Sequence, residues 1–255
     1  MNTITKNILR IGPFLFVVGM LICSAWYVIH GDVWFMTDIA RDFHLLREID
    51  QKKLILIGPR SSTAGLFHGP LWLYIMYPAY LIGQGNPVIV GWWWVMLIAI
   101  FLATTFFICK KLFGEFGAWV SLTFLSVQLV FESRGLFNPH GAYFFLPVWF
   151  FLFLLYEKNG KPLTLILFLL TSGVLIQFQM AIGIPLTILG MLALVWIVFR
   201  KKTYIHLMVL PIIFIPLLTF IVFEIRHGFS MTHAAITYLS APKGREYSSL
   251  FAIII

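Results

Sequence analysis

Long apolar runs are the feature that most constrains what this chain can fold into. A transmembrane helix needs about 17–25 apolar residues, and seven runs reach or approach that length. Charged residues make up only 11% of the chain, against about 25% in soluble domains, so lipid must cover much of the apolar surface. An all-α polytopic membrane protein is therefore predicted. Its expected spans lie at about 11–30, 88–109, 116–131, 141–156, 163–180, 182–199 and 204–223.

One further run, 70–83, is short, contains Pro78 and is bounded by Gly-Pro and Gly-Asn-Pro breakers, which suits an interfacial helix. The basic residues indicate whether it crosses, because Lys and Arg concentrate in cytoplasmic loops. If the run stays on the surface, the inner loops carry an excess of seven positive charges and the outer loops an excess of one. If it crossed, twelve of the eighteen basic residues would lie outside. We therefore expect seven spans in the plasma membrane, with the N-terminus cytoplasmic.

This topology gives the chain a single membrane module, 1–249, with a long polar outer loop at 31–87. Residues 250–255 resemble the start of a further span that is cut short, which predicts a longer natural protein. Besides the long loop, the outer face is expected to contain 132–140, the turn near 180–182 and 224–249.

An amphipathic helix is predicted in the long loop, because apolar residues recur at helical spacing from 39 to 49. We expect Thr37 or Asp38 to cap it and the helix to lie on the outer leaflet. Asp38, Arg41 and Asp42 occupy positions i, i+3 and i+4, so all three project from one side. A carboxylate there can accept a proton from a hydroxyl, and the arginine can hold a phosphate. A solvated face with an internal ion pair is the alternative.

The polar segment 58–65 and the sequence His68-Gly69-Pro70 follow this helix. Loops bounded by glycine and proline offer backbone N–H groups and hydroxyls to anions, and Arg60 adds a positive charge. An ordinary turn leading into the next helix would explain the same pattern.

Polar residues also gather at the predicted outer ends of the later spans. Each has a structural alternative: a helix cap for Asn138, a bridge between helices for Gln177, and a membrane anchor for Arg226. The full set is Glu132, Arg134, Asn138, His140, Gln177, Gln179, Glu224, Arg226 and His227.

Several functional classes are excluded by what the sequence lacks. It contains no HExxH, P-loop, GxGxxG or GxSxG pattern, which argues against zinc proteases, nucleotide hydrolases, Rossmann enzymes and α/β-hydrolases. The net charge of +8 comes from short clusters between apolar runs, so a nucleic-acid partner is not expected. Cys23 and Cys109 lie in apolar stretches and form neither a disulfide framework nor a metal-ligand spacing.

The order and spacing of these motifs, from about residue 10 to 240, resemble those of GT-C glycosyltransferases. In particular, the chain is similar to the bacterial branch that groups with protein O-mannosyltransferases and the lipid A aminoarabinose transferase. The matching segments are Thr37–Asp42, Arg47–Ile49, Gly58-Pro59 with Ser61-Ser62, His68–Leu71, Arg134 followed by Asn138-Pro139, Gln177–Gln179 and Phe223–Gly228.

The resemblance implies a seven-helix module and an inverting sugar transfer from a polyprenyl-phosphate donor to a hydroxyl of a protein, lipid or glycan acceptor. Asp38 matches the acidic residue that serves as the proposed catalytic base. The position of a second family acid holds Asn138, and a common histidine position holds Gln179. Because Asn138 stands where the family has its second acid, the resemblance does not provide both carboxylates of a metal site. A divalent cation is still the one cofactor that the resemblance leaves open.

The residues expected to bind substrate or phosphate extend over the whole outer face. They are Arg41, Asp42, Arg60, His68, Arg134, Asn138, His140, Gln179, Glu224 and Arg226, with Lys243 and Arg245 as further phosphate candidates. Two other functions stay open: a non-catalytic scaffold or lipid-binding relative, and a transporter or channel. A transporter would place charges within its spans or show paired repeats, and neither is evident.

Overall fold

The computed structural model describes residues 3–136 and 138–240, with side chains described from residue 11 onward except at position 138. Within this part of the chain, the secondary structure is helical apart from one isolated β-bridge, between Arg60 and Phe67. The elements are α1 Thr3–Ser24, α2 Trp26–Ile29, α3 Thr37–Lys52, α4 Leu71–Ile82, α5 Pro87–Glu132, α6 Asn138–Asn159, α7 Pro162–Phe178, α8 Met180–Lys201, η1 Tyr204–Phe214, α9 Leu218–Arg226 and α10 Ser230–Ser240.

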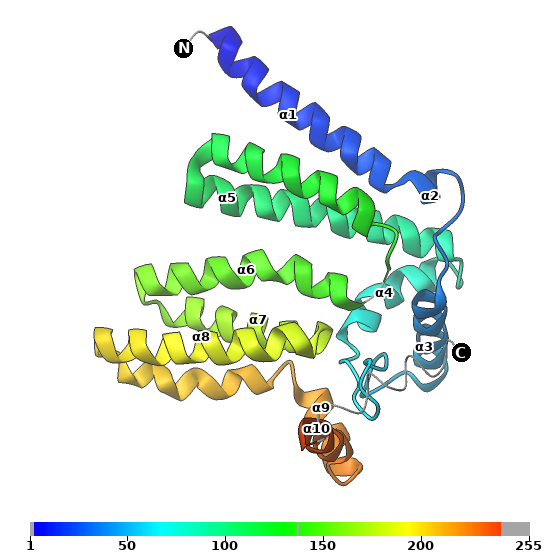
Figure 1. Ribbon diagram of the computed structural model, residues 1–255, viewed down its shortest axis with the longest axis vertical. Helices are drawn as coiled ribbons and strands as arrows, with labels where there is room; N and C mark the ends of the chain where they lie inside the picture. Colours follow the sequence, from blue (N-terminus) through cyan, green and yellow to red (C-terminus); the bar gives the residue numbers. More distant parts are fainter. Residues whose placement is uncertain (1–2, 137, 241–255) are drawn as a thin grey trace, which may run out of the picture.

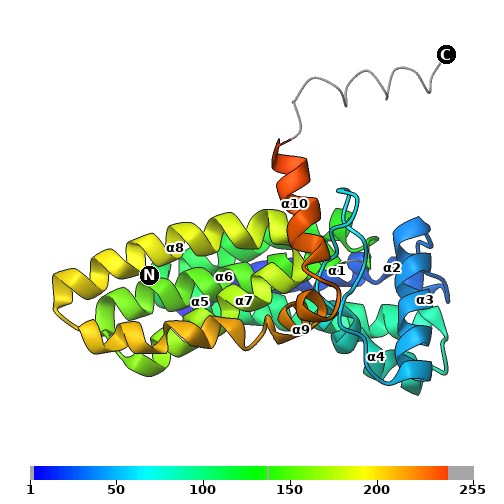
Figure 2. The same ribbon diagram turned by 90° about the horizontal axis from the view of Figure 1, so that it is seen from below.

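The long helices α1 and α5–α8 form a bundle with two different ends (Figures 1 and 2). At one end, here called the α3 end, α3 and α4 lie across the helix ends together with α9 and α10. At the other end, three turns lie together, at Gly114 in α5, at Gly160 between α6 and α7, and at Lys202 after α8 (Figure 1). Basic residues flank all three turns, so we call this the lysine end.

The helix α5 is a hairpin of two helices. Gly114 has φ +77° and ψ 179°, a conformation that glycine adopts without steric cost, and the chain reverses there (Figure 1). The two arms correspond to the predicted runs 88–109 and 116–131.

The coarse prediction of an all-α membrane protein is confirmed. Three helical segments, Pro87–Glu132, Pro139–Asn159 and Met180–Lys201, are long and apolar enough to cross a membrane. Their outward surfaces are strongly apolar, as Phe116 and Phe124 show with exposed fractions of 77% and 75%. Shorter apolar helices occur at Ile11–Ser24, Leu71–Ile82 and Pro162–Phe178.

The last predicted span, 204–223, is not a continuous α-helix. It consists of the 3₁₀ helix η1 and of α9, with a bend of 60° between them. Pro211 and Pro216 explain the interruption, because proline lacks the N–H that continues a helical ladder. The carbonyl oxygen of Pro216 accepts a hydrogen bond from Gln177 Nε2. A bridging role for this buried amide, one of the structural alternatives above, is thus observed.

The amphipathic helix α3 forms where the sequence predicts it, and Leu46 and Ile49 on its apolar side are buried. Two details differ from the prediction. The N-cap residue is Met36, and no side chain caps the helix. Asp42, expected on the solvated side, is only 4% exposed, because this side of α3 packs beside Trp72 of α4.

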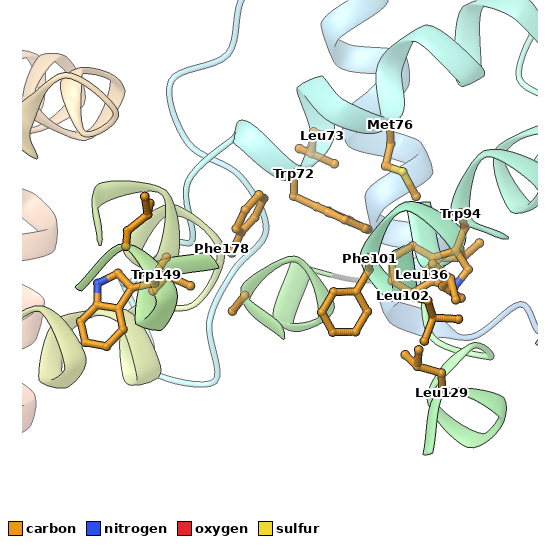
Figure 3. Close-up of a cluster of buried hydrophobic side chains, with 14 of the residues drawn as sticks. Trp72, Leu73, Met76, Trp94, Phe101, Leu102, Leu129, Leu136, Trp149 and Phe178 are labelled. Atoms are coloured by element: carbon orange, nitrogen blue, oxygen red, sulfur yellow. The ribbon is translucent and has the colours of Figure 1, made fainter. Parts of the chain in front are cut away.

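The packing between α4 and the bundle is mainly aromatic. Trp72 contacts Trp94 of α5 edge-on at 5.5 Å between ring centroids and Phe178 of α7 at 6.3 Å (Figure 3). Leu73 and Met76 follow Trp72 on α4, and both are almost fully buried. The tryptophan therefore joins two parts of the bundle and fixes α4 at its end, which in turn positions α3.

Candidate functional site

The loop 58–69 between α3 and α4 forms one wall of the candidate site. The Gly58 N–H donates to the His68 carbonyl oxygen at 2.8 Å, as in a short hairpin. The Gly69 N–H donates to the carbonyl oxygen of Gln177 at the end of α7, also at 2.8 Å. A Cβ on Gly69 would lie 1.6 Å from Gln177 Oε1, so a glycine is required here. The loop is thereby fixed to the bundle.

Arg41 on α3 is held between two carboxylates. Its Nη1 donates to Asp38 Oδ1 at 2.8 Å, while Nε and Nη2 both donate to Asp42 Oδ1, at 3.1 and 2.9 Å. The Asp38 side chain is 48% exposed, whereas that of Asp42 is 5% exposed and its Oδ2 has no hydrogen-bond partner among the described residues. The buried Asp42 carboxylate thus holds the Arg41 guanidinium in place, and the accessible Asp38 carboxylate accepts a hydrogen bond from its Nη1.

Burial shifts the pKa of two groups beside Arg41 in opposite directions. Desolvation raises the pKa of Asp42 from 3.8 to about 6, although the Arg41 charge opposes the rise. Desolvation, and then the Arg41 charge, lowers the pKa of His68 from 6.5 to about 4. At neutral pH the imidazole is therefore neutral, and Arg41 is the cation of this cluster.

A cationic cavity of about 520 Å³ opens between α3, the loop 58–69 and α9. Arg60 and Arg226 line it and form no ion pair with any described residue, whereas Lys52 pairs with Glu48 at 2.7 Å. Two unpaired guanidinium groups in one cavity suit a phosphate, which each can bind through two parallel hydrogen bonds. The charged or titratable lining residues are Arg41, Glu48, Lys52, Arg60, Arg226 and His227.

An apolar groove runs along the other side of α9. It consists of two adjoining hollows of about 790 and 480 Å³ that share four lining residues. The first hollow extends to α10 at the α3 end, and the second extends along α8 to Val195. The groove thus has the length and the apolar lining that suit a hydrocarbon chain. The shared residues are Ile176, Ile184, Phe214 and Leu217.

The helix α9 separates the cationic cavity from the apolar groove. Phe223 and Arg226 line the cavity, whereas Ile221 and Ile225 line the groove, as expected for opposite sides of one helix. Phe223 also contacts Phe67 of the loop, with ring centroids 6.2 Å apart. The two compartments are therefore separated by little more than the width of a helix, about 10–12 Å.

Six of the residues predicted from the sequence lie in or beside the cationic cavity. Arg41, Arg60 and Arg226 line the cationic cavity. Asp38 and Asp42 are bonded to Arg41, and the Arg41 charge acts on His68.

Arg134 and His140 are not part of the cavity. The guanidinium of Arg134 lies over the ring of Trp34, 5.6 Å from its centroid, on the α1–α2 side of the bundle. His140 is buried and its Nε2 lies 2.9 Å from Glu132 Oε2. These residues link α5 to its neighbours, a packing role that the sequence pattern did not distinguish from binding.

Two further predicted residues lie in or beside the apolar groove. Glu224 accepts hydrogen bonds from the backbone N–H groups of Met231 and Thr232 and from the Thr232 hydroxyl, and so caps α10. This makes it a structural residue rather than a membrane anchor. Gln179 connects α7 to α8, and its backbone carbonyl oxygen accepts from the Gly183 N–H at 2.7 Å. The Asn138 side chain, Lys243, Arg245 and residues 250–255 lie outside the described residues.

Sequence reasoning missed Lys52, Glu48 and the apolar groove. The apolar lining could not be identified, because exposed Ile and Leu on a span look the same whether they face bulk lipid or a groove. The ion pair between Glu48 and Lys52 at i, i+4 was a readable signal.

Among the described residues, no group of three or more His, Cys, Asp or Glu could hold a metal ion. Comparison with protein-family models, with curated proteins and with solved structures found no match for this chain. The function must therefore be argued from the site itself.

Proposed function

We propose that this protein is a membrane glycosyltransferase that takes a sugar from a polyprenyl-phosphate donor. The observation that carries the proposal is the pairing of a cationic cavity with a long apolar groove on two sides of α9. An amphiphile with an anionic head and a hydrocarbon tail fits this pair: Arg60 and Arg226 would hold the phosphate, and the tail would lie in the groove. The cavity and the groove account for the polyprenyl phosphate. That the lipid carries a sugar for transfer is proposed from the resemblance to GT-C glycosyltransferases.

Asp38 is the proposed catalytic base. It would take the proton from an acceptor hydroxyl as the oxygen attacks the anomeric carbon from the side opposite the phosphate. The bond from the anomeric carbon to the phosphate oxygen breaks, and polyprenyl phosphate leaves with the electron pair. The configuration at the anomeric carbon is therefore inverted. Arg41 Nη1 would move from Asp38 to the phosphate when the donor binds, which frees the carboxylate.

The proposal includes an orientation. The lysine end would face the cytoplasm, because positive residues concentrate on that side, and the α3 end would face outward. Seven spans in the plasma membrane satisfy this arrangement when the two arms of α5, the shorter apolar helices Ile11–Ser24 and Pro162–Phe178, and the bent pair of η1 and α9 are counted with α6 and α8. The acceptor would be a protein, a lipid or a glycan on the outer face.

Replacing Asp38 in the full-length protein tests the proposal. We expect Asp38→Asn to reduce sugar transfer from a radiolabelled polyprenyl-phosphate sugar by about 10²–10⁴-fold, while binding of polyprenyl phosphate is retained. Arg60→Gln combined with Arg226→Gln should instead weaken lipid binding itself. Undiminished transfer by Asp38→Asn would reject the base, and undiminished binding by the double variant would reject the phosphate site.

A non-catalytic lipid-binding protein is the second candidate. Asp38 does not line the cationic cavity, and Arg41 neutralises it in this structure, which favours binding without turnover. Wild-type protein that binds the donor lipid but transfers no sugar to any acceptor tested would support this second candidate.

A further inference from the structure

The lysine end carries an excess of basic side chains that the proposed reaction does not use. Lys158, Lys161 and Lys202 are exposed there and form no ion pair with any described residue. Lys158 and Lys161 flank the turn between α6 and α7, and Lys202 ends α8. Among the described side chains, seven basic and two acidic residues flank the three turns of this end. They are Lys110, Lys111, Lys158, Lys161, Arg200, Lys201, Lys202, Glu115 and Glu157.

The ends of α6 and α8 are joined at Glu157. Its carboxylate accepts a hydrogen bond from Arg200 and its backbone carbonyl oxygen accepts one from Lys201. These bonds bring the turn at Gly160 close to the end of α8, so Lys158, Lys161 and Lys202 surround one region. Among the described residues, Glu157 supplies the carboxylate of this region, and it is already paired with Arg200.

Aromatic and aliphatic side chains lie directly beside these cations. The Arg200 guanidinium lies 4.7 Å from the centroid of the Trp196 ring, and Lys111 Nζ lies 5.5 Å from that of Phe151. Leu163 and Tyr204, which follow the two turns, are 66% and 51% exposed. Cations above an exposed apolar band are typical of the level at which a bilayer changes from acyl chains to headgroups.

From this juxtaposition we propose that the surface around Lys158, Lys161 and Lys202 binds the headgroups of anionic phospholipids. The phosphate of the lipid lies among the three lysines, and its acyl chains descend along the exposed side chains of Leu163 and Tyr204. A soluble anion would use only the cations, whereas a phospholipid also covers the adjacent apolar band. The chemistry therefore favours a bilayer lipid over a free phosphate.

Native mass spectrometry of the full chain, released from nanodiscs of phosphatidylglycerol and phosphatidylcholine, tests the proposal. We expect the wild type to retain phosphatidylglycerol selectively. Lys161→Gln combined with Lys202→Gln should lower that retention about 25-fold, at roughly fivefold per basic residue. The matched control, Arg47→Gln with Lys53→Gln at the α3 end, removes two exposed charges and should leave retention unchanged. Equal losses in both double variants, or no preference in the wild type, would overturn the proposal.

Two further measurements use the wild-type protein, so they do not depend on how well a variant folds. The second of them also distinguishes a lipid phosphate from free phosphate. Raising the salt concentration should reduce the selectivity of the wild-type protein, since exposed charges are screened. Inorganic phosphate in excess should leave the retained phosphatidylglycerol in place, and displacement by it would reject a lipid ligand. These results do not depend on the cationic cavity, so loss of polyprenyl-phosphate binding through Arg60 and Arg226 would leave them unchanged.

Discussion

The two ends of the bundle treat their polar residues in opposite ways. At the α3 end, Asp42, His68 and Gln177 are buried and lie in a network with Arg41 and with the backbone of the loop 58–69. At the lysine end, the charged side chains are exposed, and most are cations without a carboxylate partner.

A buried charge must be paired or neutralised, whereas an exposed charge is stabilised by water. Polar residues at the α3 end therefore depend on each other's geometry, as a binding site requires. Those at the lysine end act through their summed charge. The following changes test this difference, beginning with the largest expected effect.

The strongest test is the pH dependence of unfolding. Because folding raises the pKa of Asp42, protonation of this carboxyl stabilises the folded state. The contribution is complete below pH 3.8 and is lost as the pH rises through about 6. Because folding lowers the pKa of His68, the neutral imidazole stabilises the folded state. This contribution is complete above pH 6.5 and is lost as the pH falls through about 4. The two contributions nearly cancel between pH 7 and pH 4, so the wild type should vary little from this source.

Single variants expose each contribution. On going from pH 7 to pH 4, Asp42→Asn should lose roughly 3 kcal/mol of unfolding free energy, because only His68 still titrates, and His68→Gln should gain a similar amount. Unfolding in mixed micelles at several pH values measures both. Parallel pH profiles for the two variants would show that these groups are not buried as described. Gln179→Leu removes no titratable group, so this control variant should keep the pH profile of the wild type.

The second test compares two glycines, one at each end. Gly69→Ala should destabilise the protein by about 2–3 kcal/mol, because its Cβ would overlap Gln177 Oε1. Gly160→Ala meets no atom within 4 Å and has only the strain of φ +60°, so about 1 kcal/mol is expected. Thermal unfolding in detergent gives both values. Equal losses would mean that the loop 58–69 is not fixed against α7.

The sequence predicted the bundle better than the site. Helical periodicity and breakers were sufficient to locate α3, α4 and a reversal between the runs 88–109 and 116–131, because these follow from local patterns. The burial of Asp42 could not be predicted, since it depends on how α4 places Trp72 beside α3.

The grouping of Arg60 and Arg226 in one cavity could not be predicted either, because it also depends on tertiary packing. Arg60 and Arg226 are distant in sequence but line one cavity, which adjoins α9 beyond its 60° bend from η1, whereas the Arg134 guanidinium lies over the Trp34 ring. Position at the same end of the bundle could be predicted from the order of the apolar runs, but membership of one cavity depends on tertiary packing.

The third test removes the amide that joins α7 to the bend. Gln177→Leu should cost about 1–2 kcal/mol, because the carbonyl oxygen of Pro216 and the Thr219 hydroxyl would lose their donor in a partly buried place. Gln179→Leu is the matched control two residues later, and we expect a change below about 0.5 kcal/mol. Equilibrium unfolding of both variants decides the point, and a larger loss for Gln179→Leu would contradict the assigned bridge.

Among the interactions tested, the smallest contribution to stability is expected for the ion pair that Glu157→Gln removes at the lysine end. Its ion pair with Arg200 is exposed on both sides, so its loss should cost less than about 1 kcal/mol. The same change releases Arg200 for an anionic headgroup, and phosphatidylglycerol retention should rise about fivefold. A variant that loses little stability but gains lipid would show that this end is organised around a charged partner outside the chain. A large loss of stability without a gain in lipid would instead make Glu157 a structural residue like Asp42.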